Sequence, residues 1–379
     1  MKKLLFAAAL LACFVQMPLL AAQTEAHLFL KLPPFVVTPD GMAIAPDGSL
    51  VVACPNFTSY TQGTGKPAVP ACLAKIDLNG VAHKWIELPP MAETGRICPM
   101  GIEFGPDGAL YMVDNQNWLA GNGANGEINQ GRILRLVIRH DKLEEFTVVA
   151  KGISHPNGIR FHNGNLFVTV SMLPKVKLVD GLLVSGVYRF PANGKEIEVT
   201  DTLADRSLIA SFITHNRYTQ YGLDGIAFDG KGNLFVGNFG DGTIHKLVLD
   251  AEGNVVANTL FAQTDFDITR DPAKPGFLDY AANTKLRTTD GICVDADDNL
   301  YVADFSNNSI DKVTPQGKIT VLAHNADNDG QMGGLNEPGE PIVWGGRLIV
   351  SNFDAVSGPD KVHTQHHSPA TLSVVKLHK

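Results

Sequence analysis

The chain has 379 residues, of which 44 % are hydrophobic and 18 % charged, so it is neither disordered nor collagen-like and can bury a large core. Its 39 acidic residues outnumber its 31 lysines and arginines, which gives a formal net charge of −8. No run of lysines and arginines forms a positive stripe, and this argues against nucleic acid as a partner.

The N-terminus has the three parts of a secretory signal. Residues 1–3 are charged, residues 4–13 are apolar, and the small pair Ala21-Ala22 precedes the polar chain. We therefore predict a signal peptide over residues 1–22. The mature protein over residues 23–379 is then periplasmic or secreted.

Two other interpretations of this segment are less favoured. A membrane anchor is disfavoured because Gln16 and Pro18 interrupt the apolar run, which is shorter than the roughly 20 residues of a spanning helix. The stretch 10–13 resembles a lipoprotein cleavage box, which leaves attachment through Cys13 as a minor alternative. The sequence therefore predicts no membrane span.

Four cysteines remain after the predicted cleavage, and export would permit disulfides. Their spacings match no zinc pattern. Cys54 and Cys72 bracket the loop 55–71, which makes them the one plausible disulfide pair. Cys98 and Cys293 are expected to be free thiols.

A recurring sequence unit organises the rest of the chain. Each copy has a glycine, a stretch of alternating apolar residues, a tight polar turn and a second β-rich run. The copies begin at Pro39-Asp40-Gly41, Pro99-Met100-Gly101, Pro156-Asn157-Gly158, Leu223-Asp224-Gly225, Thr289-Asp290-Gly291 and, in degenerate form, Pro338-Gly339-Glu340.

This repeat predicts an all-β fold. A strand, a tight turn and another strand are followed by a second strand pair, as over 243–249 and from 255 onward. Six repeats of four strands describe one domain, a six-bladed β-propeller of antiparallel blades. Segments 27–32 and 372–377 could share the last blade and close the ring, which would remove free sheet edges. Helical periodicity is confined to 271–286.

Loop length distinguishes the two faces of this propeller. The turns within strand pairs, such as 46–48 and 106–108, are short. The loops on the other face are long and favour a binding mouth there. They span 55–71, 116–130, 172–182, 262–287 and 354–369.

The residue before each innermost strand lies on that long-loop face, beside the central channel. Oxygen donors occupy five of the six positions, which read Asp40, Met100, Asn157, Asp224, Asp290 and Glu340 or its neighbour Glu337. Such a ring would repel itself unless a hard cation neutralised it, and Ca²⁺ prefers 6 to 8 oxygens of this kind. We therefore predict Ca²⁺, with Mg²⁺ or Mn²⁺ as alternatives.

A simpler interpretation is that Asp-Gly and Asn-Gly are good turn formers. It explains Asp47-Gly48, Asp107-Gly108 and Asn163-Gly164, which lie on the opposite face. The recurrence of one such residue per blade at the channel mouth favours the metal site.

These motifs resemble the family of gluconolactonases, regucalcin (senescence marker protein) and luciferin-regenerating enzyme, and more distantly paraoxonases and strictosidine synthases. The resemblance covers most of residues 38–355, and its best segments are 156–159 and 223–242. It implies Asn157 as a metal ligand and Asp224 as a ligand or general base. The chain departs from the family in having Asp40 where a glutamate is usual, and Met100 at the second-blade position.

The resulting hypothesis is a metal-dependent hydrolase of lactones or related esters that acts on a small-molecule substrate. A cation would polarise the carbonyl, and Asp224 or Asp290 would activate water, with His155 as a rival base. The alternatives are a non-catalytic ligand- or protein-binding propeller with a structural metal, as in NHL-type propellers, and a propeller lyase. The oligomeric state does not follow from the sequence.

Overall fold

The computed structural model describes residues 24–56, 69–116, 129–271, 274, 284–354 and 367–377. These residues form 25 β-strands and one 3-10 helix, η3 (Phe305–Asn307), and none of their helices is long and apolar enough to cross a membrane. The predicted signal peptide with Cys13, much of the long loops and most of the stretch with helical periodicity lie outside them.

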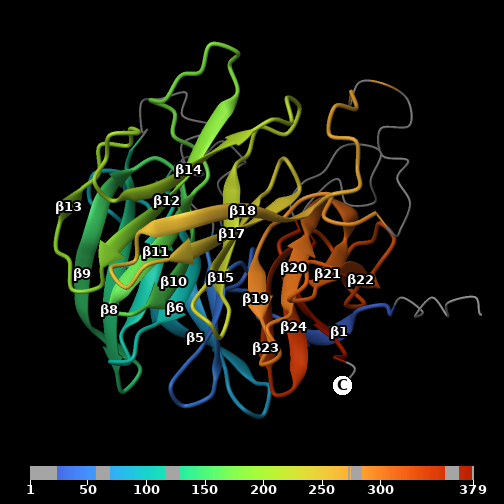
Figure 1. Cartoon of the computed structure of the whole chain (residues 1–379). Coiled ribbons are helices and arrows are strands. Elements are labelled where there is room, and N and C mark those ends of the chain that lie inside the picture. Colours follow the sequence, from blue (N-terminus) through green and yellow to red (C-terminus); the bar gives the residue numbers. More distant parts are fainter. Residues whose placement is uncertain are drawn as a thin grey trace, which may run out of the picture.

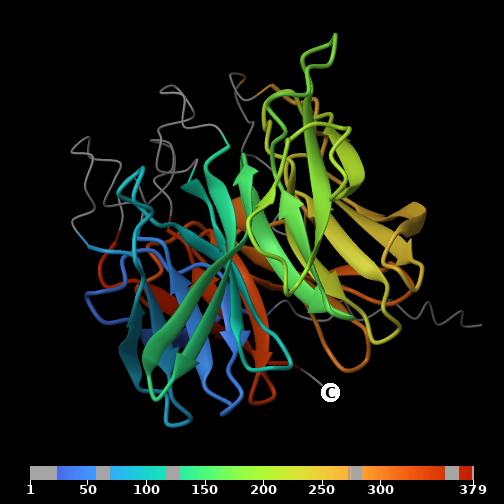
Figure 2. The ribbon, with the colours of Figure 1, turned by 90° about the vertical axis from the view of Figure 1, so that its left-hand side faces the viewer.

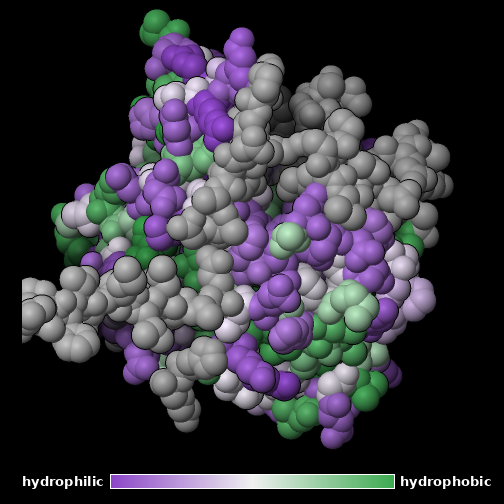
Figure 3. Space-filling model, turned by 90° about the vertical axis from the view of Figure 1, so that its right-hand side faces the viewer, coloured by the Kyte–Doolittle hydropathy of each residue, from purple (hydrophilic) through white to green (hydrophobic). Residues whose placement is uncertain are grey.

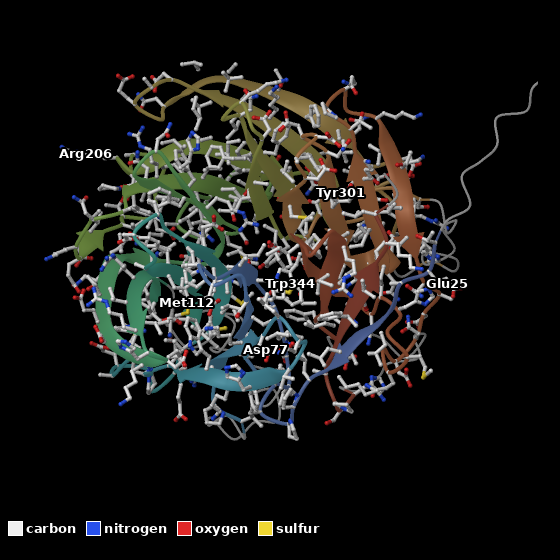
Figure 4. The ribbon with its side chains drawn as sticks, turned by 90° about the horizontal axis from the view of Figure 1, so that it is seen from below. Glu25, Asp77, Met112, Arg206, Tyr301 and Trp344 are labelled. Atoms are coloured by element: carbon white, nitrogen blue, oxygen red, sulfur yellow. The ribbon has the colours of Figure 1, made fainter. Side chains whose placement is uncertain are left out.

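Six sheets surround a central axis, and each matches one sequence repeat (Figures 1 and 4). The all-β six-bladed propeller is therefore confirmed. Blade 1 consists of β2 (Met42–Ile44), β3 (Leu50–Cys54), β4 (Cys72–Ile76) and β5 (Ala82–Glu87). Blade 2 consists of β6 (Pro99–Phe104), β7 (Leu110–Asp114), β8 (Gly131–Arg139) and β9 (Lys142–Ile153), with β13 (Ile197–Glu198) parallel to β9. Blade 3 consists of β10 (Pro156–His162), β11 (Asn165–Val170), β12 (Leu183–Pro191) and β14 (Leu208–Thr214).

The second half of the chain repeats this plan. Blade 4 consists of β15 (Leu223–Phe228), β16 (Leu234–Asn238), β17 (Thr243–Leu249) and β18 (Val255–Gln263). Blade 5 consists of β19 (Ile292–Val294), β20 (Leu300–Asp304), β21 (Ser309–Val313) and β22 (Ile319–His324). Blade 6 consists of β23 (Pro338–Trp344), β24 (Arg347–Asn352), β25 (Thr371–Val375) and β1 (His27–Lys31).

The two ends of the chain share the last blade, as predicted. Strand β1 pairs antiparallel with β25, with His27 opposite Val374 and Lys31 opposite Thr371. The backbone N–H of Leu32 also donates to the carbonyl of Ala370 at 2.8 Å. Figure 1 shows β1 among the C-terminal strands. The outer edge of blade 6 is thus a strand from the opposite end of the chain.

The core lies between the blades rather than at one centre. The second strands β3, β7, β16 and β20 are buried along their whole length, because both of their faces pack against neighbouring blades. Between blades 1 and 2, for example, Leu73, Ile102 and Leu134 are fully buried in one cluster. On the side seen in Figure 3, hydrophilic residues cover most of the middle of the described surface, and hydrophobic residues gather near its lower edge.

The two faces of the propeller differ, as loop length predicts. Short turns close the strand pairs on the lower face, and the connections between blades lie on the upper face. Figures 1 and 2 show the chain rising far above the blades only on the upper face, where the green segment of blade 3 stands highest. Gly48, Gly108 and Gly164 have positive φ values of 84°, 75° and 76° in the lower turns, so these dipeptides are indeed turn formers.

The glycines around the axis have a different role. A Cβ on Gly41 would lie 2.3 Å from the carbonyl oxygen of Met100, and one on Gly225 would lie 2.2 Å from that of Asp290. Gly101 meets the carbonyl of Asn157 in the same way, at 2.6 Å. These positions therefore need glycine because the first strands of neighbouring blades touch through their backbones, and not because of a turn.

A substitution at this contact should test it. Gly225→Ala forces the backbones of blades 4 and 5 apart, and we expect a loss of about 1–3 kcal/mol in the free energy of unfolding, the usual result of overpacking. Gly230→Ala is the matched control, because its Cβ meets only the side chain of Asp298 at 3.2 Å, and it should change stability by less than about 0.5 kcal/mol. Urea denaturation measures both, and equal stabilities would contradict the prediction.

Candidate functional site

Six equivalent positions, one per blade, surround the axis at the upper ends of the first strands. Strand pairing shows that these positions are equivalent. In every blade, the residue three places after the ring position pairs with the residue that follows the first leucine of the second strand. The positions are Asp40, Met100, Asn157, Asp224, Asp290 and Gly339, called the axis ring below. The structure therefore brings together the first five residues that the repeat singled out, and places Gly339 at the sixth.

Irregular pairing separates several of these residues from the sheet. In blade 3 the register shifts between Pro156 and Ile159, and in blade 4 between Leu223 and Ile226. Such a bulge leaves residues unpaired and redirects their side chains. Asn157 and Asp224 lie within these shifts, next to the glycines that contact the neighbouring blade. The same local irregularity thus produces both the blade contact and the ring.

Three carboxyl groups of the ring affect one another strongly. Asp40 is 8 % exposed and Asp224 is 6 % exposed. Burial, and secondarily the charge of Glu340, raises the pKa of Asp40 to about 8. Burial and the charge of Asp40 raise the pKa of Asp224, while burial and the charge of Asp224 raise that of Asp290. Asp224 and Asp290 also hydrogen-bond to each other, so the protein alone cannot keep all three ionised at neutral pH.

The donor set of the ring fits a hard divalent cation. It offers three carboxylates and the carboxamide of Asn157, with no sulfur or imidazole among them. Oδ2 of Asp40 is buried and has no hydrogen-bond partner among the described residues. No group of three or more acidic, histidine or cysteine side chains in the described part of the chain has the spacing of a preformed metal site. The unpaired oxygen and the mutual repulsion favour a cation nonetheless, because both are relieved by positive charge.

A hydrogen-bonded chain runs from the ring into blade 4. Nδ2 of Asn157 donates to the hydroxyl of Tyr221 at 2.9 Å, and Asn157 also hydrogen-bonds to Asp224. Nε2 of His155 lies 3.0 Å from the same hydroxyl, and burial lowers the pKa of His155 to about 3. His155 is therefore a neutral partner of Tyr221. Tyr221 was not among the predicted site residues, because it lies outside the repeated motif.

Glu340 lies one residue beyond the ring, where the other blades have their glycine. Its Oε1 accepts a hydrogen bond from Arg160 at 2.6 Å, and Oε2 lies against Gly291. Its charge still raises the pKa values of Asp40 and Asp224. Of the two candidates that the sequence left open, Glu340 is thus the one at the axis. Glu337 is buried before β23, and its backbone N–H donates to Asn308.

Aromatic rings form an arc on the upper face that the sequence analysis did not single out. Tyr221, Phe239, Phe305 and Phe353 follow one another at ring-centroid separations of 5.3, 5.8 and 5.7 Å. The three phenylalanines are equivalent, since each follows an Asn or Asp that ends the second strand of blades 4, 5 and 6. That repeated dipeptide is the signal that could have revealed them. The arc places an apolar wall beside the hydrogen-bonded partner of Asn157.

Other buried acids on this face are structural. Asp114 accepts hydrogen bonds from the backbone N–H of Cys98 and from Nε and Nη2 of Arg132. Asp304 accepts hydrogen bonds from the backbone N–H groups of Arg287 and Thr288. Each fixes a connection between blades by satisfying backbone donors that would otherwise be buried without partners. Full hydrogen-bonding distinguishes these acids from Asp40.

The four cysteines among the described residues are free thiols. Cys98 and Cys293 were expected to be free. Cys54 lies directly opposite Cys72 in the pairing of β3 with β4, and the two thiols contact each other. The disulfide therefore stays a prediction, although strand pairing brings together the two residues that it would join. Its loop 55–71 lies largely outside the described residues.

The fold and the axis ring define a six-bladed β-propeller with an acidic centre on its axis. No protein-family model matches the chain, and no curated protein matches its sequence. Among solved structures it resembles a luciferin-regenerating enzyme with a TM-score of 0.56 and 11 % identity, over 93 % of this chain and 94 % of that one. It resembles a gluconolactonase from Xanthomonas campestris with a TM-score of 0.54 and 12 % identity, over 93 % and 94 %. It resembles a calcium-binding protein, regucalcin, from Agrobacterium tumefaciens with a TM-score of 0.53 and 12 % identity, over 93 % of each chain. The predicted likeness to these proteins is confirmed at the level of the fold.

The raised pKa of Asp40 predicts how metal-free protein responds to pH. A carboxyl group with a higher pKa in the folded state than in the unfolded state binds its proton more tightly when folded, so stability decreases as pH rises. The ordinary pKa of an aspartate is 3.8 and that of Asp40 in the folded state is about 8, so Asp40 should lower the free energy of unfolding progressively between these pH values. Urea denaturation of chelator-treated protein should show this decline, with a smaller one in Asp40→Asn. Parallel curves for the two proteins would show the prediction to be wrong.

Proposed function

We propose that this chain is an exported, calcium-dependent hydrolase of lactones or related esters. The observation that carries the proposal is the convergence of Asp40, Asp224 and Asp290 on the axis, with one buried carboxylate oxygen of Asp40 unpartnered. The similar solved structures include a gluconolactonase and a protein described as calcium-binding. Export rests on the N-terminal sequence alone.

Four residues of the axis ring would hold the metal in the proposed chemistry. A divalent cation held by Asp40, Asn157, Asp224 and Asp290 would supply the Lewis acid that polarises the substrate carbonyl. Calcium is preferred because every available donor is an oxygen. Tyr221 holds the carboxamide of Asn157, which fixes the orientation of its oxygen. Glu340 is engaged by Arg160, and we therefore give it no direct role in the reaction.

The hydrogen-bonded pair of Asp224 and Asp290 supplies the general base. In hydrolysis the oxygen of water bonds to the carbonyl carbon, the acyl carbon–oxygen bond breaks, and the departing oxygen takes a proton. One carboxylate of the pair accepts the proton of the attacking water and returns it to the leaving oxygen. His155 is a weaker candidate for this base, because burial lowers its pKa to about 3 and its Nε2 lies in hydrogen-bond contact with the hydroxyl of Tyr221. The products are a hydroxy acid from a lactone, or an acid and an alcohol from an ester.

The aromatic arc indicates the kind of substrate. Phe239 and Phe305 are partly exposed on the upper face, so they offer apolar contact to a substrate above the ring. Such a wall suits the hydrocarbon part of a lactone or an aryl ester better than a highly hydroxylated sugar. Met100 agrees with this, since it is an apolar member of the axis ring.

Asp224→Asn should lower turnover of lactones and aryl esters about a hundredfold or more, because it removes the general base. Elemental analysis should also show less than one calcium per chain. The melting temperature of the metal-free variant should not fall, because the substitution removes a repelling buried charge. A panel of lactones and aryl esters, assayed with and without chelator, measures the activity.

Asp297→Asn is the matched control, since Asp297 is exposed in the lower turn between β19 and β20, at the opposite end of β19 from the ring. It should retain full activity and metal content. Wild-type protein that binds one calcium but hydrolyses nothing in the panel would instead favour a binding propeller with a structural metal. A product without added water would favour a lyase.

A further inference from the structure

A cavity opens at the end of the axis opposite the ring, on the lower face. It has a volume of about 360 Å³, within the range of small-molecule pockets. Figure 4 views the molecule from this side, with the blades surrounding the centre and Trp344, at the end of β23, near it. The first strands of all six blades supply the lining, whose charged residues are Glu103, Arg160 and Glu340.

The cavity exists because three blades have small residues at one level of the axis. The residues three places after the axis ring form a lower tier, which consists of Ala43, Glu103, Arg160, Ala227, Cys293 and Ile342. Two alanines and a cysteine leave space there, whereas Glu103 and Arg160 bring charge into it. This tier lies below the acidic ring and takes no part in the proposed hydrolysis.

Arg160 is hydrogen-bonded to other residues of the protein. Its guanidinium donates to Glu340 at 2.6 Å, to the carbonyl of Ile292 at 3.0 Å and to that of Ile159 at 2.8 Å. These contacts extend from blade 3 to blades 5 and 6, so Arg160 crosses the channel. A bound anion would have to displace Glu340 from it.

Glu103 has no comparable hydrogen bonds among the described residues. It is half-buried, lines the cavity, and forms no direct hydrogen bond or ion pair with any described residue, although the charge of Arg160 acts on it. The charged groups of the lining are Glu103, Glu340 and Arg160, so the ionised cavity has one net negative charge. Two carboxylates thus share the charge of one arginine, and a cation that entered the cavity would balance the second carboxylate.

The rest of the lining indicates an organic cation rather than a metal. Phe104, Phe161 and Phe228 stand among aliphatic side chains around the two carboxylates. A calcium ion needs about six or more oxygens, and Glu340 is held by Arg160, so the cavity offers too few. An ammonium ion with short alkyl groups matches it, since the charge can meet Glu103 while the alkyl groups contact apolar walls and aromatic faces.

We propose that the lower mouth of the axial channel binds a small alkylammonium ion, with Glu103 as its counter-ion. This site is separate from the acidic ring and does not depend on the proposed hydrolase activity. Isothermal titration calorimetry of the full chain tests it with n-butylammonium and tetramethylammonium as probes. The neutral n-butanol and the anionic n-butyrate are the matched comparisons. The ammonium ions should bind with a stoichiometry of one and at least about tenfold more tightly than either, the scale of one charge-assisted contact.

Variants distinguish ammonium binding at this site from non-specific attraction to an acidic protein. Glu103→Gln should weaken ammonium binding about tenfold or more. Glu93→Gln makes the same change in net charge at an exposed residue between blades 1 and 2, and should leave binding unchanged. Cys293→Leu should also weaken binding, because the larger side chain fills part of the cavity. Asp224→Asn should leave it unchanged.

The inference is overturned if no ammonium probe binds, if n-butanol binds as tightly as n-butylammonium, or if Glu103→Gln binds like wild type. Circular dichroism and the melting temperature check that each variant is folded. Should Cys293→Leu fail to fold, Glu103→Gln decides the question, because it changes one atom of a side chain that forms no direct hydrogen bond or ion pair with any described residue.

Discussion

The close contact between neighbouring blades at the axis is the constraint on which the rest of the structure depends. A glycine of one blade touches a carbonyl oxygen of the next, and no side chain fits between them. The first strands consequently converge more tightly than side-chain packing would allow. Whatever residue precedes that glycine is carried toward the axis together with its counterparts from the other blades.

This constraint explains why so many acids lie together in one small volume. Folding energy comes from the apolar layers between blades, which are remote from the axis, so the ring can hold groups that repel one another. The raised pKa values of Asp40, Asp224 and Asp290 result from that arrangement. Burial also raises the pKa values of structural acids such as Asp114 and Asp304, but there backbone donors satisfy each carboxylate.

The repeat made most of the architecture predictable. Turn chemistry and apolar alternation located the strands, and one motif per blade located five positions of the ring. The sixth position could not be read correctly, because Pro338-Gly339-Glu340 lacks the usual order and puts its glutamate where a glycine normally stands. Register alone shows that Gly339 is the ring residue.

Other features depend on contacts between distant blades, which local sequence cannot report. Arg160 reaches Glu340 across 180 residues of chain, and Tyr221 reaches Asn157 across 64. Arg160 and Glu340 belong to different blades, and Tyr221 lies in the connection between blades 3 and 4. The repeated motif of one blade therefore predicts neither contact. The lower cavity is a similar case, since it results from small residues at equivalent places in three separate blades.

The pairing of β1 with β25 has a consequence for how the molecule is made. The first strand to be synthesised belongs to the last blade, and its partners are translated more than three hundred residues later, as the pairing of His27 with Val374 shows. Five blades can form in order of synthesis, but the circle is completed only when both ends of the polypeptide meet. Contacts of such long sequence separation slow folding, so ring closure is expected to be the late step. Until then β25 has an unpaired edge that another chain could occupy.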